Sequence, residues 1–430
     1  MTSYHCPVDG TRSAITALTW CCPVCRGPWD LDFAPARGVG ADALSGRADS
    51  LWRYKEFLPL DTPAISLGEG RTPLVPLTDA VSAKLDFLMP TLSFKDRGAV
   101  VLVELARRLA PDRVVADSSG NAGASVAAYC ARAGLPCTVY VPEGTPAGKT
   151  ERIRAHGARL VAVPGGREAT ASAARAAADG PGVFYASHVF NPYFLHGTKT
   201  YVYELWEELG GRLPDTLVVP VGNGTLLLGA ALAVAELRAL GLITARPRLV
   251  AVQAEAVSPL AAAFRAGAED LLPGDMTGAD PGTEELLAGD ASGAEGPLPA
   301  DMAGAEGPLP GDVAGAEGPL PASAGAAVPG GSGAVPAAGT APTLAEGIAI
   351  PRPPRARQIL TAVRASGGSF LTVSEDTIRA ARQDLAARGL FVEPTGAVCW
   401  AAVREGGDAL RGEVVVPLCG AGTKAGTAAG

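Results

Sequence analysis

From residue 99 onward, short apolar segments of this 430-residue chain alternate with longer, alanine-rich segments. The short segments have the length of β-strands, and the longer ones have the length and composition of helices. Strands without a polar face, separated by helices, indicate a parallel sheet covered on both faces. We therefore predict an α/β fold, with strands at 113–117, 137–141, 159–163, 183–186, 216–220, 369–373 and 413–418, and helices at 100–109, 121–134, 147–156, 167–179, 353–366 and 375–388.

The chain is longer than a single hydrophobic core usually holds, so more than one domain is expected. We predict two doubly wound, mostly parallel sheet domains preceded by a small N-terminal element. The predicted boundaries are 1–30 for the N-terminal element, 31–65 for a linker and lead-in segment, and 66–267 with 341–430 for the two-domain core, whose smaller domain spans roughly 99–190.

Residues 268–340 differ from the rest of the chain in composition. Glycine, proline and alanine dominate, and an 11-residue pattern occurs three times, starting at Asp290, Asp301 and Asp312. With so few large apolar residues, the segment cannot bury enough surface to offset the entropy cost of ordering. We predict a disordered insertion, with a repeat solenoid as the less favoured alternative.

Charge and hydropathy argue against two classes of partner. The net charge is -8 and there is no dense run of lysine and arginine, so a nucleic-acid surface is not predicted. The first residues lack the basic and apolar regions of a signal peptide, and no apolar run reaches the length of a membrane span. We expect a cytoplasmic protein that binds neither nucleic acid nor membrane.

Four of the eight cysteines lie within the first 25 residues. The segments CPVDG (6–10) and CPVCRG (22–27) are predicted to form two tight turns of the kind that present thiolates to a tetrahedral zinc ion, as in a zinc ribbon. The ligands would be Cys6, Cys22 and Cys25, with Asp9, His5 or Cys21 as the fourth. The alternative is a ribbon without metal, held by its packing alone. In both cases the role is structural, because a closed four-ligand site leaves no position for substrate.

Lys95 is the candidate catalytic residue. It stands in PTLSFKDRG (90–98), next to Phe94 and before the apolar run 99–103. Burial in such surroundings lowers the pKa of a lysine, and the neutral amine is the nucleophile that forms Schiff bases with aldehydes. The alternative is that Lys95, Asp96 and Arg97 form a solvated charge cluster at the start of a helix, because lysine is rarely buried.

Three polar turns follow predicted strands. The turn DSSGNAGAS (117–125) follows the strand at 113–117, the turn VGNGTL (221–226) follows the strand at 216–220, and Cys419-Gly420 follows the last strand. Open parallel sheets bind ligands at the carboxyl ends of their strands, and glycine turns leading into helices expose backbone amides to phosphate. Taken singly, such a turn is also typical of an ordinary helix start.

Together, the lysine and the three turns supply the four functions that pyridoxal phosphate requires. These are an amine for its aldehyde, a donor for its ring oxygen, a cradle for its phosphate and a partner for its ring nitrogen. The combination is more specific than any single motif and favours the Schiff-base interpretation of Lys95. Glu393 is a further candidate neighbour of the cofactor, whereas His156, His188 and His196 lack metal-ligand spacing and are interpreted as packing or surface residues.

At these residues the chain resembles the pyridoxal-phosphate enzymes of the tryptophan synthase β fold (fold type II), and within them the threonine synthase group. The resemblance extends from about residue 52 to residue 424, without the insertion. It includes the stretches 66–74, 90–98, 118–125, 191–200, 221–224, 247–254 and 343–348, together with the zinc-ribbon-like N-terminus.

The resemblance implies a role for each motif residue. Lys95 would form the Schiff base and Asn121 would donate to the ring oxygen of the cofactor. Cys419 would face the pyridine nitrogen. The phosphate would be held by Gly222, Asn223, Gly224 and Thr225, and the substrate carboxylate or phosphate by Ser93, Arg97, Ser118 and Ser119. A homodimer is also implied.

The activity that the resemblance implies is that of a pyridoxal-phosphate-dependent carbon–oxygen lyase, which converts O-phosphohomoserine and water into threonine and phosphate. Two departures from the usual pattern leave the substrate open: Leu92 stands where the group usually has glycine, and Ala421 where it often has histidine. The alternatives are a threonine or serine dehydratase, a synthase that uses phosphoserine, or a non-catalytic relative that only binds the cofactor.

Overall fold

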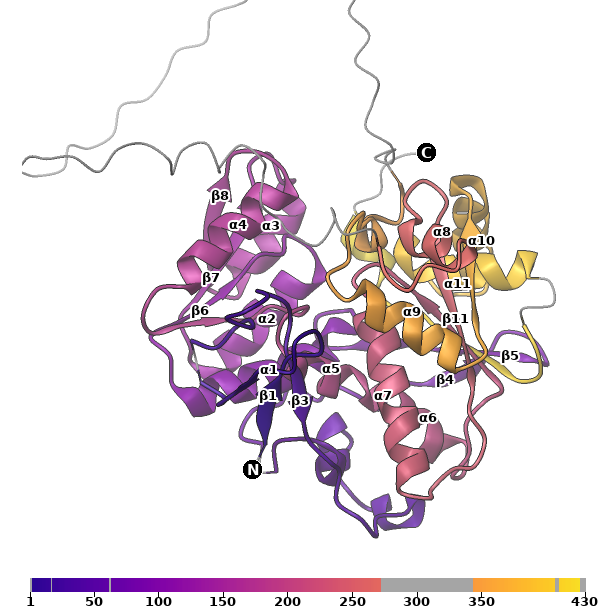
Figure 1. Ribbon diagram of the computed structural model, residues 1–430. Helices are drawn as coiled ribbons and strands as arrows, with labels where there is room; N and C mark the ends of the chain where they lie inside the picture. The colour runs from indigo at the N-terminus through magenta and orange to yellow at the C-terminus, as the bar shows by residue number, and fades with distance from the viewer. Residues whose placement is uncertain (1, 17, 62, 272–342, 407–409, 426–430) are drawn as a thin grey trace, which may run out of the picture. The chain divides into compact units, whose positions relative to one another are not determined.

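The computed structural model describes residues 2–16, 18–61, 63–271, 343–406 and 410–425. The glycine-, proline- and alanine-rich insertion, with its three repeats, lies outside these residues from 272 onward. Within them the α/β prediction is confirmed, because helices alternate with the strands of one mixed and one parallel sheet (Figure 1).

The larger sheet has six strands in the order β12-β11-β10-β13-β5-β4. The first five run parallel, and β4 pairs antiparallel with β5 at the edge. The strands are β4 (Leu74–Pro76), β5 (Val81–Lys84), β10 (Thr216–Pro220), β11 (Arg248–Ala254), β12 (Ser369–Val373) and β13 (Val414–Pro417). Strands from both sides of the insertion therefore interleave in one sheet, with β10 between β11 and β13.

The smaller sheet has four strands, all parallel, in the order β8-β7-β6-β9. Its strands are β6 (Arg113–Ala116), β7 (Cys137–Pro142), β8 (Arg159–Val163) and β9 (Val183–Tyr185). The helices along this part of the chain are α1 (Lys95–Leu109), α2 (Asn121–Ala133), α3 (Ala147–Ala155), α4 (Arg167–Ala178) and α5 (Pro192–Thr198). These elements agree with the predicted ones to within a few residues, except that α1 starts at Lys95 itself and α5 was not predicted.

The remaining helices accompany the larger sheet. They are α6 (Thr200–Glu208), α7 (Thr225–Ala239), α8 (Pro259–Arg265), α9 (Ala356–Ala365), α10 (Glu375–Ala387) and α11 (Pro394–Glu405). Both β10 and β11 are buried almost throughout, which explains why their sequences have no polar face. None of the helices among the described residues is both long enough and apolar enough to span a bilayer.

The N-terminal element contains a small antiparallel sheet in the order β2-β1-β3, formed by β1 (Ser3–His5), β2 (Arg12–Ser13) and β3 (Asp30–Asp32). The following segment, predicted as a linker, contains two 3-10 helices, at Ala41–Leu44 and Leu51–Phe57. Leu51, Tyr54 and Phe57 are fully buried there. This segment is thus part of the hydrophobic core, a fact that its glycine and charge content concealed.

Candidate active site

The amine of Lys95 lies among aromatic rings and polar turns. Helix α1 begins at Lys95, and the amide of Phe94 donates to the carbonyl of Cys419, which ties the helix start to the end of β13. The amine is 4.2 Å from the centroid of the Phe94 ring and 5.8 Å from that of Phe194, and it donates to Thr225 Oγ1 at 3.5 Å. Lys95 remains partly exposed, so its amine is within reach of a small molecule.

Burial lowers the pKa of the Lys95 amine to about 8. The negative charge of Glu393 opposes this shift, and the positive charge of Arg167 adds to it. A pKa of about 8 leaves an appreciable share of neutral amine near neutral pH, which an ordinary lysine does not have. The amine therefore has the property required of a nucleophile or a general base.

The predicted phosphate turn connects β10 to α7. Gly224 has φ +73°, and a Cβ there would lie 2.4 Å from Ile359 Cδ1; a Cβ on Gly222 would lie 2.8 Å from the Cα of Ile348. Only glycine fits at Gly224, because of its positive φ and the nearby Ile359, and at Gly222, because of the nearby Ile348. Gly224 also caps α7 without a side-chain hydrogen bond, so no side chain of the cap competes for the first amides of the helix, which are oriented to bind an anion.

Asn121 is the first residue of α2, directly after the serine and glycine turn. Its amide donates to both carboxylate oxygens of Glu393, at 3.0 and 3.1 Å. The turn is tight, because a Cβ on Gly123 would lie only 1.7 Å from the carbonyl oxygen of Ser118. Ser118 and Ser119 are half-buried in this turn, and Ser118 Oγ accepts from the amide of Gly120. The structure thus joins Asn121 to Glu393, the candidate neighbour from the C-terminal part of the chain.

Cys419 and Ser93 lie next to Lys95. Cys419 is buried two residues after the end of β13, and burial, as the main cause, raises the pKa of its thiol, which therefore stays protonated. Ser93 forms an isolated bridge with Gly420, and its fully buried hydroxyl has no hydrogen-bond partner among the described residues. A buried polar group without a partner is uncommon, and this hydroxyl is therefore available to form a hydrogen bond with a bound molecule or a water.

Leu92 adopts a backbone conformation that leucine disfavours, with φ 64°. Its amide donates to Met89 and its carbonyl accepts from Ala421, so both neighbouring backbone groups hold it in place. The side chain is 39% exposed. Leu92, which stands where the resembling group usually has glycine, therefore projects outward beside Ser93 and holds the backbone in a strained conformation.

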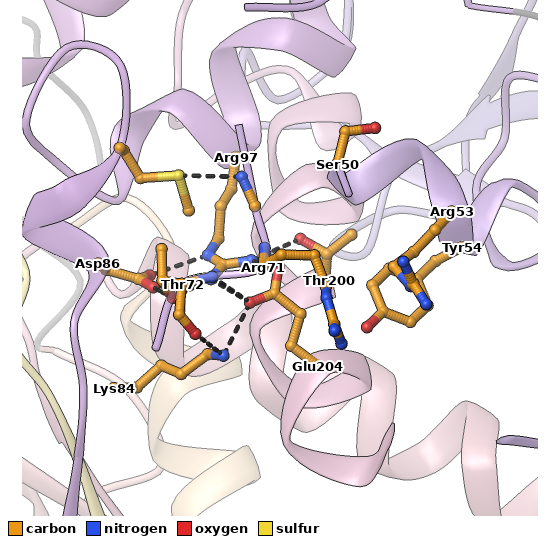
Figure 2. A network of polar contacts seen from close by, with 12 residues as sticks. Ser50, Arg53, Tyr54, Arg71, Thr72, Lys84, Asp86, Arg97, Thr200 and Glu204 are labelled. Atoms are coloured by element: carbon orange, nitrogen blue, oxygen red, sulfur yellow. Dashed lines mark hydrogen bonds and ion pairs between the residues drawn. The ribbon is translucent and has the colours of Figure 1, made fainter. Parts of the chain in front are cut away.

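The prediction that Arg97 binds substrate is wrong. Arg97 is fully buried, and Figure 2 shows its guanidinium between Asp86 and Glu204. It forms paired hydrogen bonds of 2.5 to 2.9 Å with these two carboxylates, and it also donates to Thr72 and Thr200. Glu204 in addition pairs with Lys84 at 3.0 Å. All three guanidinium nitrogens are thus used inside the protein, in a network that anchors the first turn of α1.

Two residues near the site were not predicted. His188 Nε2 lies 3.4 Å from the side-chain amide of Asn223, so the packing interpretation of this histidine missed its contact with the glycine turn. Arg167, exposed at the start of α4, lowers the pKa of both Lys95 and His188 through its charge. The sequence signal that could have pointed to Arg167 is the pair Gly165-Gly166, which precedes it and follows the predicted strand at 159–163.

The N-terminal cysteines gather with one aspartate. One ligand atom from each of Cys6, Asp9, Cys22 and Cys25 lies within 4.8 Å of all the others. Backbone amides of Val8, Val24 and Gly27 each lie 3.4 Å from a cysteine sulfur, the geometry of two turns that orient thiolates. Of the three candidates for the fourth ligand, the group formed by the described residues contains Asp9 and neither His5 nor Cys21.

Comparison with known proteins identifies the family. A model of the family described as "Pyridoxal-phosphate dependent enzyme" matches residues 65–293 and 319–420. The threonine synthase of Methanosarcina acetivorans is 27% identical over 416 residues, which cover 94% of this chain and 86% of that protein. The threonine synthase of Methanocaldococcus jannaschii is 34% identical over 246 residues, which cover 55% of this chain and 60% of that protein.

A solved structure supports the same fold. The L-serine ammonia-lyase of the fungus Rhizomucor miehei matches with a TM-score of 0.58 and 17% identity, over 81% of this chain and 93% of that chain. At this identity the likeness concerns the fold alone. Because the family model covers more than half of the sequence, the chain belongs to the family of pyridoxal-phosphate dependent enzymes.

Proposed function

We propose that this protein is a threonine synthase, which converts O-phosphohomoserine and water into threonine and phosphate. The proposal is supported by relatives of that name, one of which aligns with nearly the whole chain. The observation that carries it is the amine of Lys95, which lies beside Thr225 of the glycine turn and whose pKa burial lowers to about 8. This combination suits proton transfer at an amino-acid carbon.

The residues present fit pyridoxal phosphate. The backbone amides at the start of α7 can donate to a phosphate, and the Lys95 amine can form a Schiff base with an aldehyde. The buried Ser93 hydroxyl can donate to a bound molecule. When bound, the cofactor would supply an electron sink for charge that develops on the substrate. Cys419 would face its ring nitrogen, and a neutral thiol there restrains the sink, which favours elimination and replacement over transamination.

Lys95 is the proposed acid and base throughout. Its amine would remove the α-proton and one Cβ proton of the substrate as phosphate leaves from Cγ. It would then deliver one proton to Cγ and, after the hydroxyl of water has added at Cβ, one to Cα, while the remaining proton of water goes to phosphate. Gly222, Asn223, Gly224 and Thr225 would hold the cofactor phosphate, and Asn121 would donate to the ring oxygen. For the substrate anions we retain Ser93, Ser118 and Ser119. Arg167 replaces Arg97 as the candidate cation, since its charge reaches Lys95.

The decisive experiment compares two products of the purified protein. We expect phosphate release from O-phosphohomoserine and little ammonia release from threonine or serine. Lys95→Ala should abolish turnover and also the visible absorption of lysine-bound cofactor. Ammonia release without phosphate release would replace the proposal with a dehydratase, and phosphate release from phosphoserine with a β-replacement synthase. Bound cofactor without turnover of any of these substrates would indicate a non-catalytic relative.

We also propose that Cys6, Asp9, Cys22 and Cys25 bind one structural zinc ion. Three thiolates and a carboxylate are ligand types that Zn²⁺ accepts in tetrahedral sites, and the four ligand atoms are already close together. Metal analysis of the purified protein should find one zinc per chain. Cys25→Ala should lose it, whereas the matched control Cys21→Ala, outside the group, should keep it. Protein without zinc, produced in zinc-replete medium, would contradict this proposal.

A homodimer in the cytoplasm is proposed from the resemblance alone. Light scattering should give twice the chain mass of 43.4 kDa, and cell fractionation should recover the protein with cytosolic enzymes. A monomer, or recovery in another fraction, would contradict the respective proposal.

A further inference from the structure

The N-terminal ribbon, defined as residues 3–32, contacts the turn 187–191. The backbone amide of Trp29 donates to the carbonyl of Phe190 at 3.1 Å, and the side-chain amide of Asn191 donates to the hydroxyl of Tyr4 at 3.3 Å. Tyr4 and Trp29 are fully buried and stack on each other, with their ring centroids 5.7 Å apart. Tyr4, which precedes the cysteine turn 6–10, and Trp29, which follows the cysteine turn 22–27, therefore both contact the turn 187–191.

Arg355, just before α9, forms hydrogen bonds with both the ribbon and the turn 187–191. It is 1% exposed and donates to the carbonyl of Val189 at 2.7 Å, to the carbonyl of Trp29 at 2.6 Å and to Asp30 Oδ1 at 2.7 Å. Asp30 is the carboxylate that compensates its buried charge. Because an uncompensated buried charge is costly, displacement of the ribbon would release Arg355 and with it the carbonyl of Val189.

The turn carries His188 to the proposed phosphate site. The backbone amides of Val189 and Phe190 donate to Ser187 Oγ, and the backbone amide of Asn191 donates to the Ser187 carbonyl, so residues 187–191 form one hydrogen-bonded turn. His188 lies between them and contacts Asn223 of the glycine turn at 3.4 Å. Burial and the charges of Lys95 and Arg167 keep the pKa of His188 low, so its neutral ring can accept a hydrogen bond from the Asn223 amide.

The ribbon is too small to hold its own shape. Its three strands contain three, two and three residues, fewer than an independent sheet needs. The turn 6–10 follows β1, next to Tyr4, and the turn 22–27 precedes Trp29 and β3. An ion bound by Cys6, Asp9, Cys22 and Cys25 would therefore join the two chain segments that contact the turn 187–191.

From these contacts we infer that the N-terminal ribbon is a metal-dependent brace that positions His188, and through it Asn223, for binding of the cofactor phosphate. The inference rests on the proposed cofactor and zinc sites, and it adds a link between them: metal binding in the ribbon would support cofactor binding at the glycine turn. His188 is a positioning residue in this arrangement, because it acts through Asn223.

The test measures the dissociation constant of pyridoxal 5′-phosphate, by absorbance titration of protein freed of cofactor, together with zinc content. Cys25→Ala removes the metal. Asp30→Ala breaks the link to Arg355 without removing a metal ligand. Both should weaken cofactor binding by about tenfold, the effect of one lost hydrogen bond. The matched control is Asp32→Ala, two residues along β3, whose exposed ion pair with Arg12 stays within the ribbon; its affinity should be unchanged.

The outcomes separate the inference from the proposals beneath it. Wild-type affinity in zinc-free Cys25→Ala, or in Asp30→Ala, would overturn the brace while leaving the zinc and cofactor sites intact. A wild-type protein that binds no cofactor would overturn both the proposed function and the brace. If the wild-type protein binds cofactor and the variants behave as expected, but no phosphate is released from O-phosphohomoserine, the proposed function fails and the brace stands.

Discussion

Asn121 and Glu393 are 272 positions apart in the chain, yet the side-chain amide of Asn121 donates to both oxygens of the Glu393 carboxylate. The same carboxylate lies against Gly420, where a Cβ would come within 2.3 Å of it, and its charge raises the pKa of Lys95. Glu393, at the start of α11, thus contacts Asn121 at the start of α2 and the turn at Gly420, and its charge acts on the proposed catalytic amine of Lys95.

The charge of Glu393 predicts a shift in the titration of Lys95. Glu393→Gln removes a negative charge that favours the protonated amine, so the pKa of Lys95 should fall further below about 8. The pH profile of the rate at which pyridoxal phosphate combines with cofactor-free protein should then move to lower pH. Glu405→Gln, at the other end of the same helix, is the control and should leave the profile in place. A profile that moves to higher pH in Glu393→Gln would refute the assignment.

Loss of Arg97 should destabilise the protein rather than weaken substrate binding. In Arg97→Met the buried carboxylates of Asp86 and Glu204 lose their main partner, which should lower the free energy of unfolding by about 3–5 kcal/mol. Urea denaturation at neutral pH measures this. Arg107→Met, which breaks a partly exposed pair on the same helix, should cost less than about 1 kcal/mol. Equal losses in the two variants would contradict the buried network.

The same network predicts a dependence of stability on pH. Burial would raise the pKa of Glu204, but Arg97 and Lys84 outweigh burial and lower it to about 2. Because this value lies below the ordinary 4.5, Glu204 contributes stability above pH 4.5 and loses that contribution as the pH falls toward 2. Urea midpoints measured over this range should fall more steeply for the wild type than for Glu204→Gln. Parallel curves would show that Glu204 titrates normally.

Gly224 and Gly241 form a matched pair at the two ends of α7. Both have positive φ, +73° and +72°, but a Cβ would meet Ile359 at Gly224 and nothing within 4 Å at Gly241. Each alanine variant should therefore lose about 1–2 kcal/mol of unfolding free energy from backbone strain. Gly224→Ala should lose about 1–3 kcal/mol more from overpacking and should also bind the cofactor more weakly. Unimpaired cofactor binding in Gly224→Ala would count against a phosphate site in this turn.

Leu92 offers a test of stored strain beside the site. With φ at 64°, leucine costs about 1–2 kcal/mol that glycine does not, although glycine gives back part of this through its flexible unfolded state. Leu92→Gly should therefore be as stable as the wild type, to within about 1 kcal/mol, or more stable. Leu92→Val should be clearly less stable, since a β-branched residue tolerates this conformation worst. Denaturant midpoints in the reverse order would contradict the strained conformation.

Much of the fold was predictable because its signals are local. The strands β7, β8, β10 and β12 and the helices α2, α3, α4, α9 and α10 follow from short apolar runs and alanine-rich segments, which determine secondary structure within a few residues. Asn121 and the turn from Gly222 to Thr225 could be singled out because a strand end followed by glycine has a known orientation in a parallel sheet. Lys95 could be singled out by its apolar neighbours, which lower the pKa of a lysine. The strand β4 and the buried segment Leu51–Phe57 had no comparable signal.

The sequence by itself determined the class of fold and the family, and it supplied the candidates for the reactive residues, since all of these depend on short patterns. The tertiary structure decided which of them meet. It enclosed Arg97 between two carboxylates, brought Asp9 rather than His5 or Cys21 to the three cysteines, and set His188 against Asn223 and Glu393 against Asn121. The physical reason is that burial, pKa and pairing depend on neighbours contributed by distant segments. A local pattern carries no information about them.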